Sequence, residues 1–206
     1  MEEHSHYEYH SAEPAWGNQY LWPPVRQLLL ERLPAQGTVF ELGCGNGAIA
    51  GKMVEQGFQV TAVDTSQSGI TQAAAANPGA TFALGSAYDD LRTSYGQFDA
   101  VVSLEVVEHC FWPRKFAHSV SQLLKPGGLA LISTPYHGYL KNLLLALSGK
   151  LEAHWDPLWD GGHIKFWSKS SLTTLLTEQG LTVETIYPVG RIAPLAKSMI
   201  AVAKKL

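Results

Sequence analysis

The sequence has few cysteines, no block of basic residues and no long apolar run. Its two cysteines, Cys44 and Cys110, form no Cys-x-x-Cys pair, so a disulfide framework is excluded and a reducing cytoplasm is the expected location. The first residues are acidic and histidine-rich, unlike a secretory signal. No stretch of about 18 apolar residues occurs, so we expect no membrane-spanning helix.

The charge balance is also close to neutral. The chain of 206 residues has 15 Lys and Arg against 18 Asp and Glu, a formal net charge of −3, and its basic residues are scattered. Nucleic-acid-binding domains usually carry a basic face, so we expect no nucleic-acid partner. The length suits a single domain with a sizeable core. No feature of the sequence indicates a particular oligomeric state.

The most informative stretch is the glycine-rich segment at residues 39–50. Gly43, Gly45 and Gly47 alternate between a predicted strand and an alanine-rich predicted helix, so the chain can turn sharply there without β-carbons. A strand, a glycine turn and a helix N-terminus bring backbone N–H groups close to a bound small molecule. The next predicted strand ends at Asp64, whose carboxylate can accept both hydroxyls of a ribose.

The segment Glu41-Leu42-Gly43-Cys44-Gly45-Asn46-Gly47, together with Asp64, resembles motif I of the class I S-adenosylmethionine (SAM)-dependent methyltransferases. Later segments, residues 98–103 and 123–133, are similar to the family's fourth strand and to its fifth strand with the preceding turn. The resemblance spans about residues 25–203. It implies an α/β, Rossmann-like fold with a seven-stranded, mostly parallel sheet, an antiparallel last strand and helices on both faces.

The same resemblance assigns the cofactor-binding residues. Ser86 stands where the family often has an aspartate, and its hydroxyl still offers the adenine one hydrogen bond. The residues implied are Glu41, Gly43, Cys44, Gly45 and Gly47 at the methionine end, Asp64 and Thr65 at the ribose, Ser86 and Ala87 at the adenine, and Leu104 and Glu105 opposite.

Hydrophobic periodicity predicts alternating helices and strands, which favours an open, mostly parallel sheet covered on both faces. Pro23 and Pro24 suit the first turn of the first helix. The predicted helices are 22–33, 47–56, 66–76, 114–124 and 168–179, and the predicted strands are 38–42, 58–63, 81–84, 98–103, 129–133, 181–187 and 198–203.

A second constellation follows the predicted fourth strand. Spacings of three and four residues would place Glu105, Glu108 and His109 on one side of a helical turn. His163 precedes a later helix and can return to the same edge of the sheet. Two carboxylates and two imidazoles favour either a divalent ion such as Mg²⁺, Mn²⁺ or Zn²⁺, or acid–base catalysis by His109 or His163.

Glu-x-x-Glu-His, followed some fifty residues later by His163 and a Lys-Phe pair, is similar to the ubiquinone-biosynthesis O-methyltransferases and also to the small-RNA 2′-O-methyltransferases. The first resemblance implies O-methylation of a phenolic or catechol-type hydroxyl, with or without a metal. Two alternatives remain open: a metal-independent C- or N-methyltransferase acting on another small metabolite, and a non-catalytic SAM-binding regulatory or assembly protein.

Two segments flank this predicted core. Residues 1–24 are rich in aromatic side chains and are interpreted either as a tail or as a lid over the cofactor. Residues 138–162 form an insert over the acceptor site, with leucines at helical spacing followed by Trp155 and Trp159. The insert is either a substrate lid or, within 138–160, a peripheral membrane contact.

Overall fold

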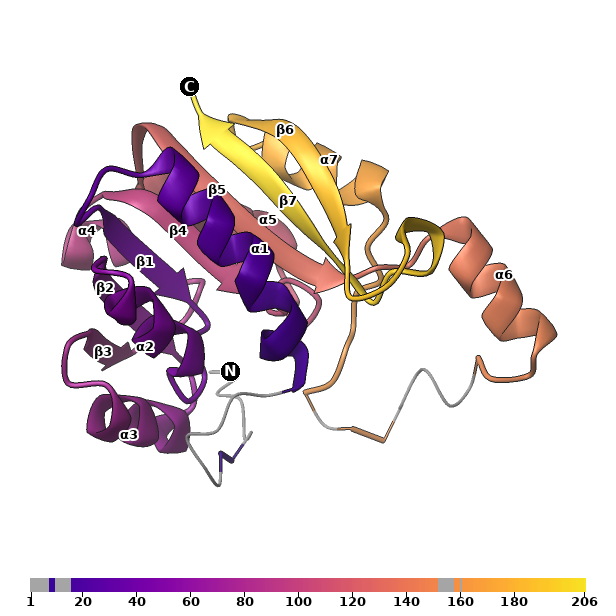
Figure 1. Ribbon diagram of the computed structural model, residues 1–206, viewed down its shortest axis with the longest axis horizontal. Helices are drawn as coiled ribbons and strands as arrows, with labels where there is room; N and C mark the ends of the chain where they lie inside the picture. The colour runs from indigo at the N-terminus through magenta and orange to yellow at the C-terminus, as the bar shows by residue number, and fades with distance from the viewer. Residues whose placement is uncertain (1–7, 10–15, 152–157, 160) are drawn as a thin grey trace.

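The protein is built on one seven-stranded sheet with the strand order β3-β2-β1-β4-β5-β7-β6 (Figure 1). The computed structural model describes residues 8–9, 16–151, 158–159 and 161–206. β1 pairs in parallel with β2 and β4, β2 with β3, and β4 with β5, whereas β7 is antiparallel to both of its neighbours. The strands are β1 Thr38–Leu42, β2 Gln59–Asp64, β3 Thr81–Leu84, β4 Phe98–Leu104, β5 Leu124–Pro135, β6 Leu181–Val189 and β7 Ser198–Lys205. The predicted topology, including the antiparallel last strand, is confirmed.

Helices cover both faces of this sheet. Along β1, Val39 packs on one face and Phe40 on the other, because successive strand side chains point to opposite sides. The Val39 face is covered by α1 Trp16–Arg32, α2 Ala48–Glu55 and α3 Gln67–Ala76. The Phe40 face is covered by α4 Leu91–Tyr95, α5 Pro113–Leu123 and α7 Lys169–Thr177. The sheet is therefore buried between two helical layers, as parallel sheets usually are.

The first helix begins earlier than its proline pair suggested. α1 starts at Trp16 and contains Pro23 and Pro24 in its interior, whereas the prediction began at residue 22. Leu21 is fully buried, and the Tyr20 hydroxyl hydrogen-bonds the Ser198 hydroxyl on β7 at 2.9 Å. These tertiary contacts hold the turn that precedes the prolines. The predicted arm at residues 1–24 thus overlaps α1, and most of its remainder lies outside the described residues.

Three further local differences have physical causes. The short helix α4 was not predicted; Asp90 caps it by accepting a hydrogen bond from the Thr93 N–H. β5 begins at Leu124 rather than 129 because it pairs with Phe98 across a register shift. Residues 105–110 are turns rather than the expected helical turn, since Glu105 has a left-handed backbone with φ 57°.

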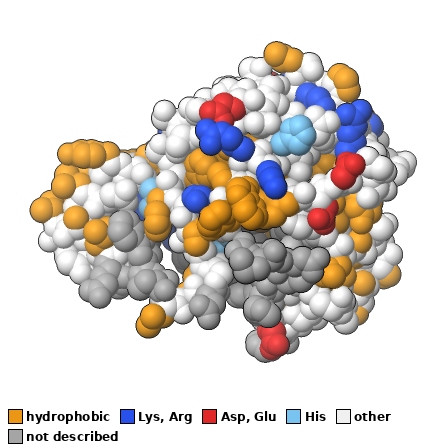
Figure 2. All heavy atoms as spheres, turned by 180° about the vertical axis from the view of Figure 1, so that it is seen from behind, with side chains coloured by type: hydrophobic (Ala, Val, Ile, Leu, Met, Phe, Trp, Pro, Cys, Tyr) orange, Lys and Arg blue, Asp and Glu red, His pale blue; other side chains and the backbone are white. Residues whose placement is uncertain are grey.

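The insert contains helix α6 Tyr139–Leu147, which projects beyond the end of the sheet (Figure 1). None of its described residues is buried, and hydrophobic side chains gather at this end of the molecule (Figure 2). A short 3₁₀ helix, η2 Ala193–Leu195, contacts α6. Among the described helices, none is long and apolar enough to span a bilayer.

Candidate functional site

The carboxyl ends of β1, β2 and β4 meet at one edge of the sheet, because these neighbouring strands are parallel. The glycine turn follows β1, Asp64 ends β2, and Leu104 ends β4. This is the edge at which open parallel sheets bind ligands. Every cofactor-binding residue implied by the sequence lies at or just after the end of one of four adjacent strands, β1 to β4.

The three glycines of the turn have different neighbours. All have positive φ, from 53° at Gly45 to 81° at Gly43. A β-carbon on Gly43 would lie 2.5 Å from Val106 Cγ2, and one on Gly47 would lie 2.6 Å from Ala73 Cβ. Both glycines therefore allow close packing as well as the backbone turn. The turn is held to β2 by hydrogen bonds from the Gly43 and Cys44 N–H groups to the Val63 carbonyl.

Asp64 is bound to the turn that it faces. Its Oδ2 accepts a hydrogen bond from the Gly45 N–H at 2.7 Å, and its Oδ1 accepts one from the Ser66 N–H at 2.8 Å. Burial raises the pKa of Asp64, and the backbone hydrogen bonds from Ser66, Gly45 and Thr65 partly offset that rise. The carboxylate is thus fixed in orientation at the expected ribose position.

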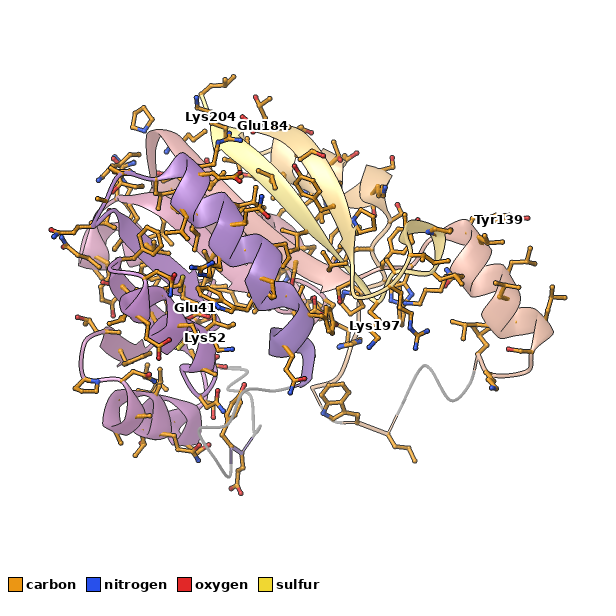
Figure 3. The ribbon with its side chains drawn as sticks, in the orientation of Figure 1. Glu41, Lys52, Tyr139, Glu184, Lys197 and Lys204 are labelled. Carbon is orange, nitrogen blue, oxygen red and sulfur yellow. The ribbon has the colours of Figure 1, made fainter. Side chains whose placement is uncertain are left out.

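Glu41 lies deeper, near the end of β1 and beside Ala50 of α2 (Figure 3). Its side chain is 3% exposed, and its Oε2 makes no hydrogen bond with the described residues. Burial raises its pKa well above the ordinary value, and the nearby charge of Asp64 raises it further. Burial likewise raises the pKa of the Cys44 thiol, so Cys44 is a packed, unreactive thiol rather than a nucleophile.

The adenine-side residues form a compact turn after β3. The Ser86 N–H donates to Asp89 Oδ2 at 2.7 Å, and the Ser86 hydroxyl accepts from the Tyr88 N–H at 3.2 Å. The Ala87 carbonyl accepts from the Ser119 hydroxyl at 2.7 Å, which fixes the turn to α5. Ser86 and Ala87 are partly exposed, as are Thr65 and Leu104 at the neighbouring strand ends.

Glu105 is separated from the other predicted metal ligands. Its Oε1 accepts a hydrogen bond from the Ser133 hydroxyl at 2.7 Å, and its Oε2 accepts one from the Ser198 hydroxyl at 3.0 Å. Burial raises the pKa of Glu105 to about 7, against the lowering effect of the Ser133 and Ser198 hydrogen bonds. Because the left-handed backbone turns this side chain away from Glu108, its carboxylate accepts hydrogen bonds from Ser133 of β5 and Ser198 of β7.

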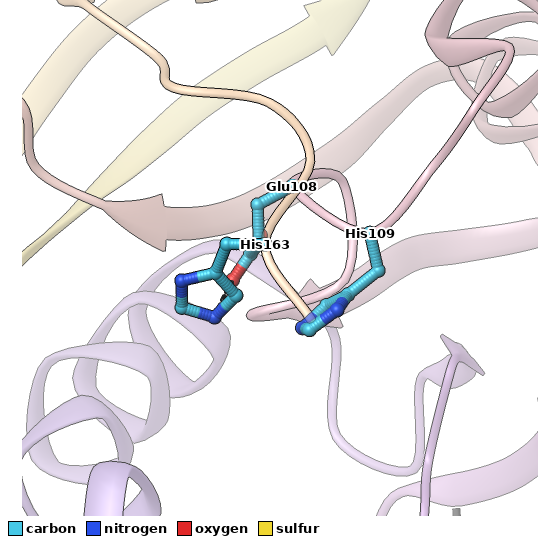
Figure 4. Close-up of side chains that lie close together, drawn as sticks. All are labelled: Glu108, His109 and His163. Carbon is cyan, nitrogen blue, oxygen red and sulfur yellow. Dashed lines mark ion pairs between the residues drawn. The ribbon is translucent and has the colours of Figure 1, made fainter. Parts of the chain in front are cut away.

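Glu108, His109 and His163 do come together (Figure 4). Each offers one ligand atom, and these three atoms lie within 4.8 Å of one another. The two imidazole rings are 4.8 Å apart, and His163 Nε2 lies 4.0 Å from Glu108 Oε1. The backbone builds this cluster: the Ile164 and Lys165 N–H groups both donate to the Glu108 carbonyl at 3.0 Å.

The orientation of His109 is fixed by the same segment. Its Nδ1 lies 2.7 Å from the Gly161 carbonyl oxygen and 3.1 Å from that of Gly162. Carbonyl oxygens only accept hydrogen bonds, so Nδ1 carries the hydrogen and the neutral ring keeps its lone pair on Nε2. Such an Nε2 can bind a cation or accept a proton. The Trp159 ring packs near His109 and His163, at 5.7 and 5.4 Å.

The Glu108 side chain is 1% exposed, and neither of its carboxylate oxygens has a hydrogen-bond partner among the described residues. Burial raises its pKa well above the ordinary value, and the charge of Glu105 adds to this. The Thr134 hydroxyl offsets this rise only in part, and the His163 imidazole lies no nearer than 4.0 Å. A buried carboxyl group with such weak compensation is costly, and such groups concentrate at binding and catalytic sites. The group is therefore suited to a cation or a proton.

Four further residues lie at this edge. Tyr9 lies against the glycine turn, while Tyr20, Ser133 and Ser198 surround Glu105. Tyr9 and Tyr20 belong to the aromatic N-terminal segment that the sequence analysis interpreted as a tail or a lid, whereas Ser133 and Ser198 were missed. No local pattern identifies Ser133 or Ser198, because each meets Glu105 only through strand pairing. His137 contacts Phe166, and the Lys165 ammonium lies over the Phe111 ring.

Comparison with known proteins agrees with this architecture. The model of a family described as a methyltransferase domain matches residues 16–186. The chain belongs to the methyltransferase domain family. Among solved structures, a TehB-like SAM-dependent methyltransferase from Corynebacterium glutamicum has a TM-score of 0.64 at 20% identity and covers 87% of this chain and 86% of its own. Magnesium protoporphyrin IX methyltransferase from Synechocystis PCC 6803, with bound SAH, has a TM-score of 0.66 at 18% identity, covering 89% and 80%.

Within this methyltransferase family, the similar curated sequences include ubiquinone biosynthesis O-methyltransferases. The protein from Caulobacter vibrioides is 38% identical over 123 residues, which is 57% of this chain and 48% of the relative. That from Rickettsia canadensis is 31% identical over 151 residues, which is 72% and 64%. The chain therefore spans about half to two thirds of the length of these relatives.

Proposed function

We propose that this protein transfers a methyl group from SAM to a phenolic or catechol-type hydroxyl of a small, lipophilic acceptor. The observation that carries the proposal is the position of the Glu108, His109 and His163 cluster, which begins four residues after the end of β4, at the edge where the cofactor motif lies. The names of the curated relatives support an oxygen acceptor.

The residues present fit SAM. The glycine turn leaves its backbone without side chains, and β-carbons at Gly43 and Gly47 would clash with Val106 and Ala73. Asp64 is held in a fixed orientation at the end of the adjacent strand. Glu41 has a buried oxygen without a hydrogen-bond partner, which suits the ammonium end of the cofactor. When bound, SAM supplies a sulfonium methyl group, so the protein mainly has to position the acceptor oxygen and remove its proton.

The cluster also fits a divalent ion. One buried carboxylate and two imidazoles are borderline ligands that suit Zn²⁺ or Mn²⁺ better than Mg²⁺, which prefers oxygen. The backbone carbonyls that hold His109 Nδ1 leave Nε2 free to coordinate a metal, since a metal-binding histidine commonly donates its other ring N–H to such an oxygen. A phenolic hydroxyl has a pKa near 10, so a nearby cation would favour its nucleophilic oxyanion.

The alternative route uses the same residues without a metal. His109 Nε2 would accept the acceptor's proton, and bound SAM would supply the methyl group, with the electron pair of the broken sulfur–methyl bond staying on sulfur. The negative charge of the Glu108 carboxylate would then stabilise the resulting His109 imidazolium, with His163 beside both groups. The two routes make opposite predictions about the metal content of the purified protein.

Cofactor binding is tested by calorimetric titration of SAM and S-adenosylhomocysteine. We expect binding by the wild type and at least tenfold weaker binding by Asp64→Ala. Asp99→Ala is the matched control, since Asp99 also accepts a backbone N–H bond, from Thr38, but at the opposite end of the strands. An inability of the wild type to bind either ligand would overturn the proposed function.

Metal dependence is tested by elemental analysis of the untreated protein. We expect a stoichiometric divalent ion that is lost in His163→Ala and retained in His118→Ala, an exposed histidine on α5. Cofactor binding by a protein that contains no metal would rule out the metal-assisted route and leave His109 as the proposed general base. Methylation of catechols in the presence and absence of a chelator then separates the two routes.

We further propose that α6 contacts a lipid surface or the apolar part of the acceptor. Tyr139 and Leu147 are 83% and 76% exposed, and Tyr139 points away from the sheet (Figure 3). Leu158, farther along the insert, is 89% exposed. Co-sedimentation with anionic vesicles, compared between the wild type and Leu147→Ser, tests the lipid contact. Equal sedimentation of the two proteins would exclude it.

A further inference from the structure

We propose that Trp159 is a positioning residue of the candidate site, whose indole holds the imidazoles of His109 and His163 in their mutual orientation. The inference rests on the proposed function. The three rings contact one another in pairs: the imidazole centroids are 4.8 Å apart, and the indole lies 5.7 Å from His109 and 5.4 Å from His163. These separations are typical of favourable edge-to-face and tilted ring contacts. Because the indole contacts both imidazoles at once, it limits the rotation of each.

The main chain next to the indole also orients His109. The Gly162 N–H donates to the Trp159 carbonyl at 2.9 Å, which ties the two residues together. A β-carbon on Gly162 would lie 3.0 Å from the indole carbons Cδ2 and Cε3, so the missing side chain lets the indole pack directly on the main chain. The carbonyls of Gly161 and Gly162 accept the hydrogen bond from His109 Nδ1. The indole therefore packs on the same glycine that helps to orient His109.

The exposure of Trp159 separates this role from a role in the hydrophobic core. The residue is 42% exposed, and an apolar side chain stabilises a fold in proportion to the area that it buries. Groups that orient metal-binding histidines act differently, since their removal typically weakens metal binding by about 10- to 100-fold. We therefore expect substitution of Trp159 to change the histidine pair far more than the free energy of unfolding.

Trp112 provides a matched control. It is 45% exposed, close to the value for Trp159, and its ring contacts those of Tyr88 and Phe111 at 5.5 and 4.9 Å. Trp112→Ala therefore removes the same side chain, at nearly the same exposure, from a pair of rings that contains no histidine. A general effect of losing a surface tryptophan would appear in both variants, whereas a positioning effect would appear in Trp159→Ala alone.

The first measurement is the affinity of the metal-free protein for Zn²⁺, by calorimetry against a competing chelator. We expect about 10- to 100-fold weaker binding by Trp159→Ala and unchanged binding by Trp112→Ala. Trp159→Phe keeps an aromatic ring at this position, and we expect it to bind Zn²⁺ within about fivefold of the wild type.

The second measurement needs neither metal nor turnover. NMR of the metal-free protein follows the proton on His109 Nδ1, which is hydrogen-bonded to the Gly161 carbonyl beside the indole. We expect a slowly exchanging signal in the wild type, in Trp112→Ala and in Trp159→Phe. In Trp159→Ala we expect the signal to be lost through exchange with water, because the ring no longer limits the rotation of His109.

Each outcome decides the inference. Unchanged Zn²⁺ affinity in Trp159→Ala would refute it and leave the proposed function intact, as would equal losses in Trp159→Ala and Trp112→Ala. A much larger loss of thermal stability in Trp159→Ala than in Trp112→Ala would also refute it, because the indole would then act on the fold. If the wild type bound no Zn²⁺, the metal-assisted route would fail and the NMR signal alone would decide: its retention in Trp159→Ala would refute the positioning role, and its loss would support that role for His109 as the base. Failure of the wild type to bind SAM would overturn the proposed function, which keeps the two conclusions distinguishable.

Discussion

The Ser198 hydroxyl donates a 3.0 Å hydrogen bond to Glu105 Oε2, joining the first residue of β7 to the residue that follows β4, 93 positions earlier. Tyr20 of α1 extends this link by its hydrogen bond to Ser198. The buried carboxyl group is thus the point at which α1, β5 and β7 are fixed to the candidate site. Its raised pKa contributes to the pH dependence of the protein's stability.

Glu105→Gln should stabilise the protein at alkaline pH. The pKa of Glu105 is raised to about 7 in the folded state from 4.5, so the folded protein binds this proton more tightly than the unfolded chain. The stability that it contributes is full below about pH 4.5 and is lost as the pH rises through 7. Glutamine is neutral throughout and retains partners for both serines. We expect the free energy of unfolding of the variant to exceed that of the wild type by on the order of 1–3 kcal/mol at pH 8.5 and to equal it below pH 5. Urea unfolding at both pH values checks this, with Glu31→Gln as an exposed control. A constant difference across pH would contradict the prediction.

Gly43→Ala should destabilise the fold more than Gly57→Ala. The two glycines have similar φ, 81° and 90°, so both substitutions impose the same kind of backbone strain, about 1–2 kcal/mol. A β-carbon on Gly43 would also lie 2.5 Å from Val106, whereas at Gly57 it would meet nothing within 4 Å. Overpacking adds about 1–3 kcal/mol at Gly43 alone. Urea unfolding of both variants measures the difference, and equal losses would show that Val106 moves freely.

Glu108→Gln should raise the stability of the metal-free protein and abolish metal binding. The carboxyl group is buried with no hydrogen-bond partner among the described residues, so neutralising it removes a desolvation cost. In the presence of a chelator we expect the variant's free energy of unfolding at pH 8 to rise by on the order of 1 kcal/mol. Its divalent metal content should fall to background. A variant that retained stoichiometric metal would remove Glu108 from the ligand set.

Leu147→Ala and Leu172→Ala should have very different effects on stability. Leu147, on α6, is 76% exposed, whereas Leu172, on α7, is fully buried. We expect a change below about 0.5 kcal/mol for the first and a loss of about 2–5 kcal/mol for the second. Chemical unfolding measures both. If Leu147→Ala proved as damaging as Leu172→Ala, α6 would pack against the domain in solution instead of presenting its leucines to lipid or acceptor.

The sequence by itself determined where the strands lie, because alternating periodicities depend on neighbouring residues along the chain. The order of the strands, with an antiparallel last strand, followed from the family resemblance and not from periodicity. The glycine turn followed by Asp64 predicted the cofactor edge. The positive φ values of the turn are a local requirement, so its glycines were recognisable without a structure, whereas their close contacts with Val106 and Ala73 were not.

Only the tertiary structure decided which side chains meet. Glu105 was grouped with Glu108 by helical spacing, but its left-handed backbone sends it to Ser133 and Ser198, which strand pairing brings from far along the chain. The Glu108, His109 and His163 cluster depends on residues 161–165 docking on the Glu108 carbonyl, more than fifty positions away. Tyr9 reaches Gly45 through bonds to α3. Contacts of this kind depend on the folded path of the chain, which no local pattern encodes.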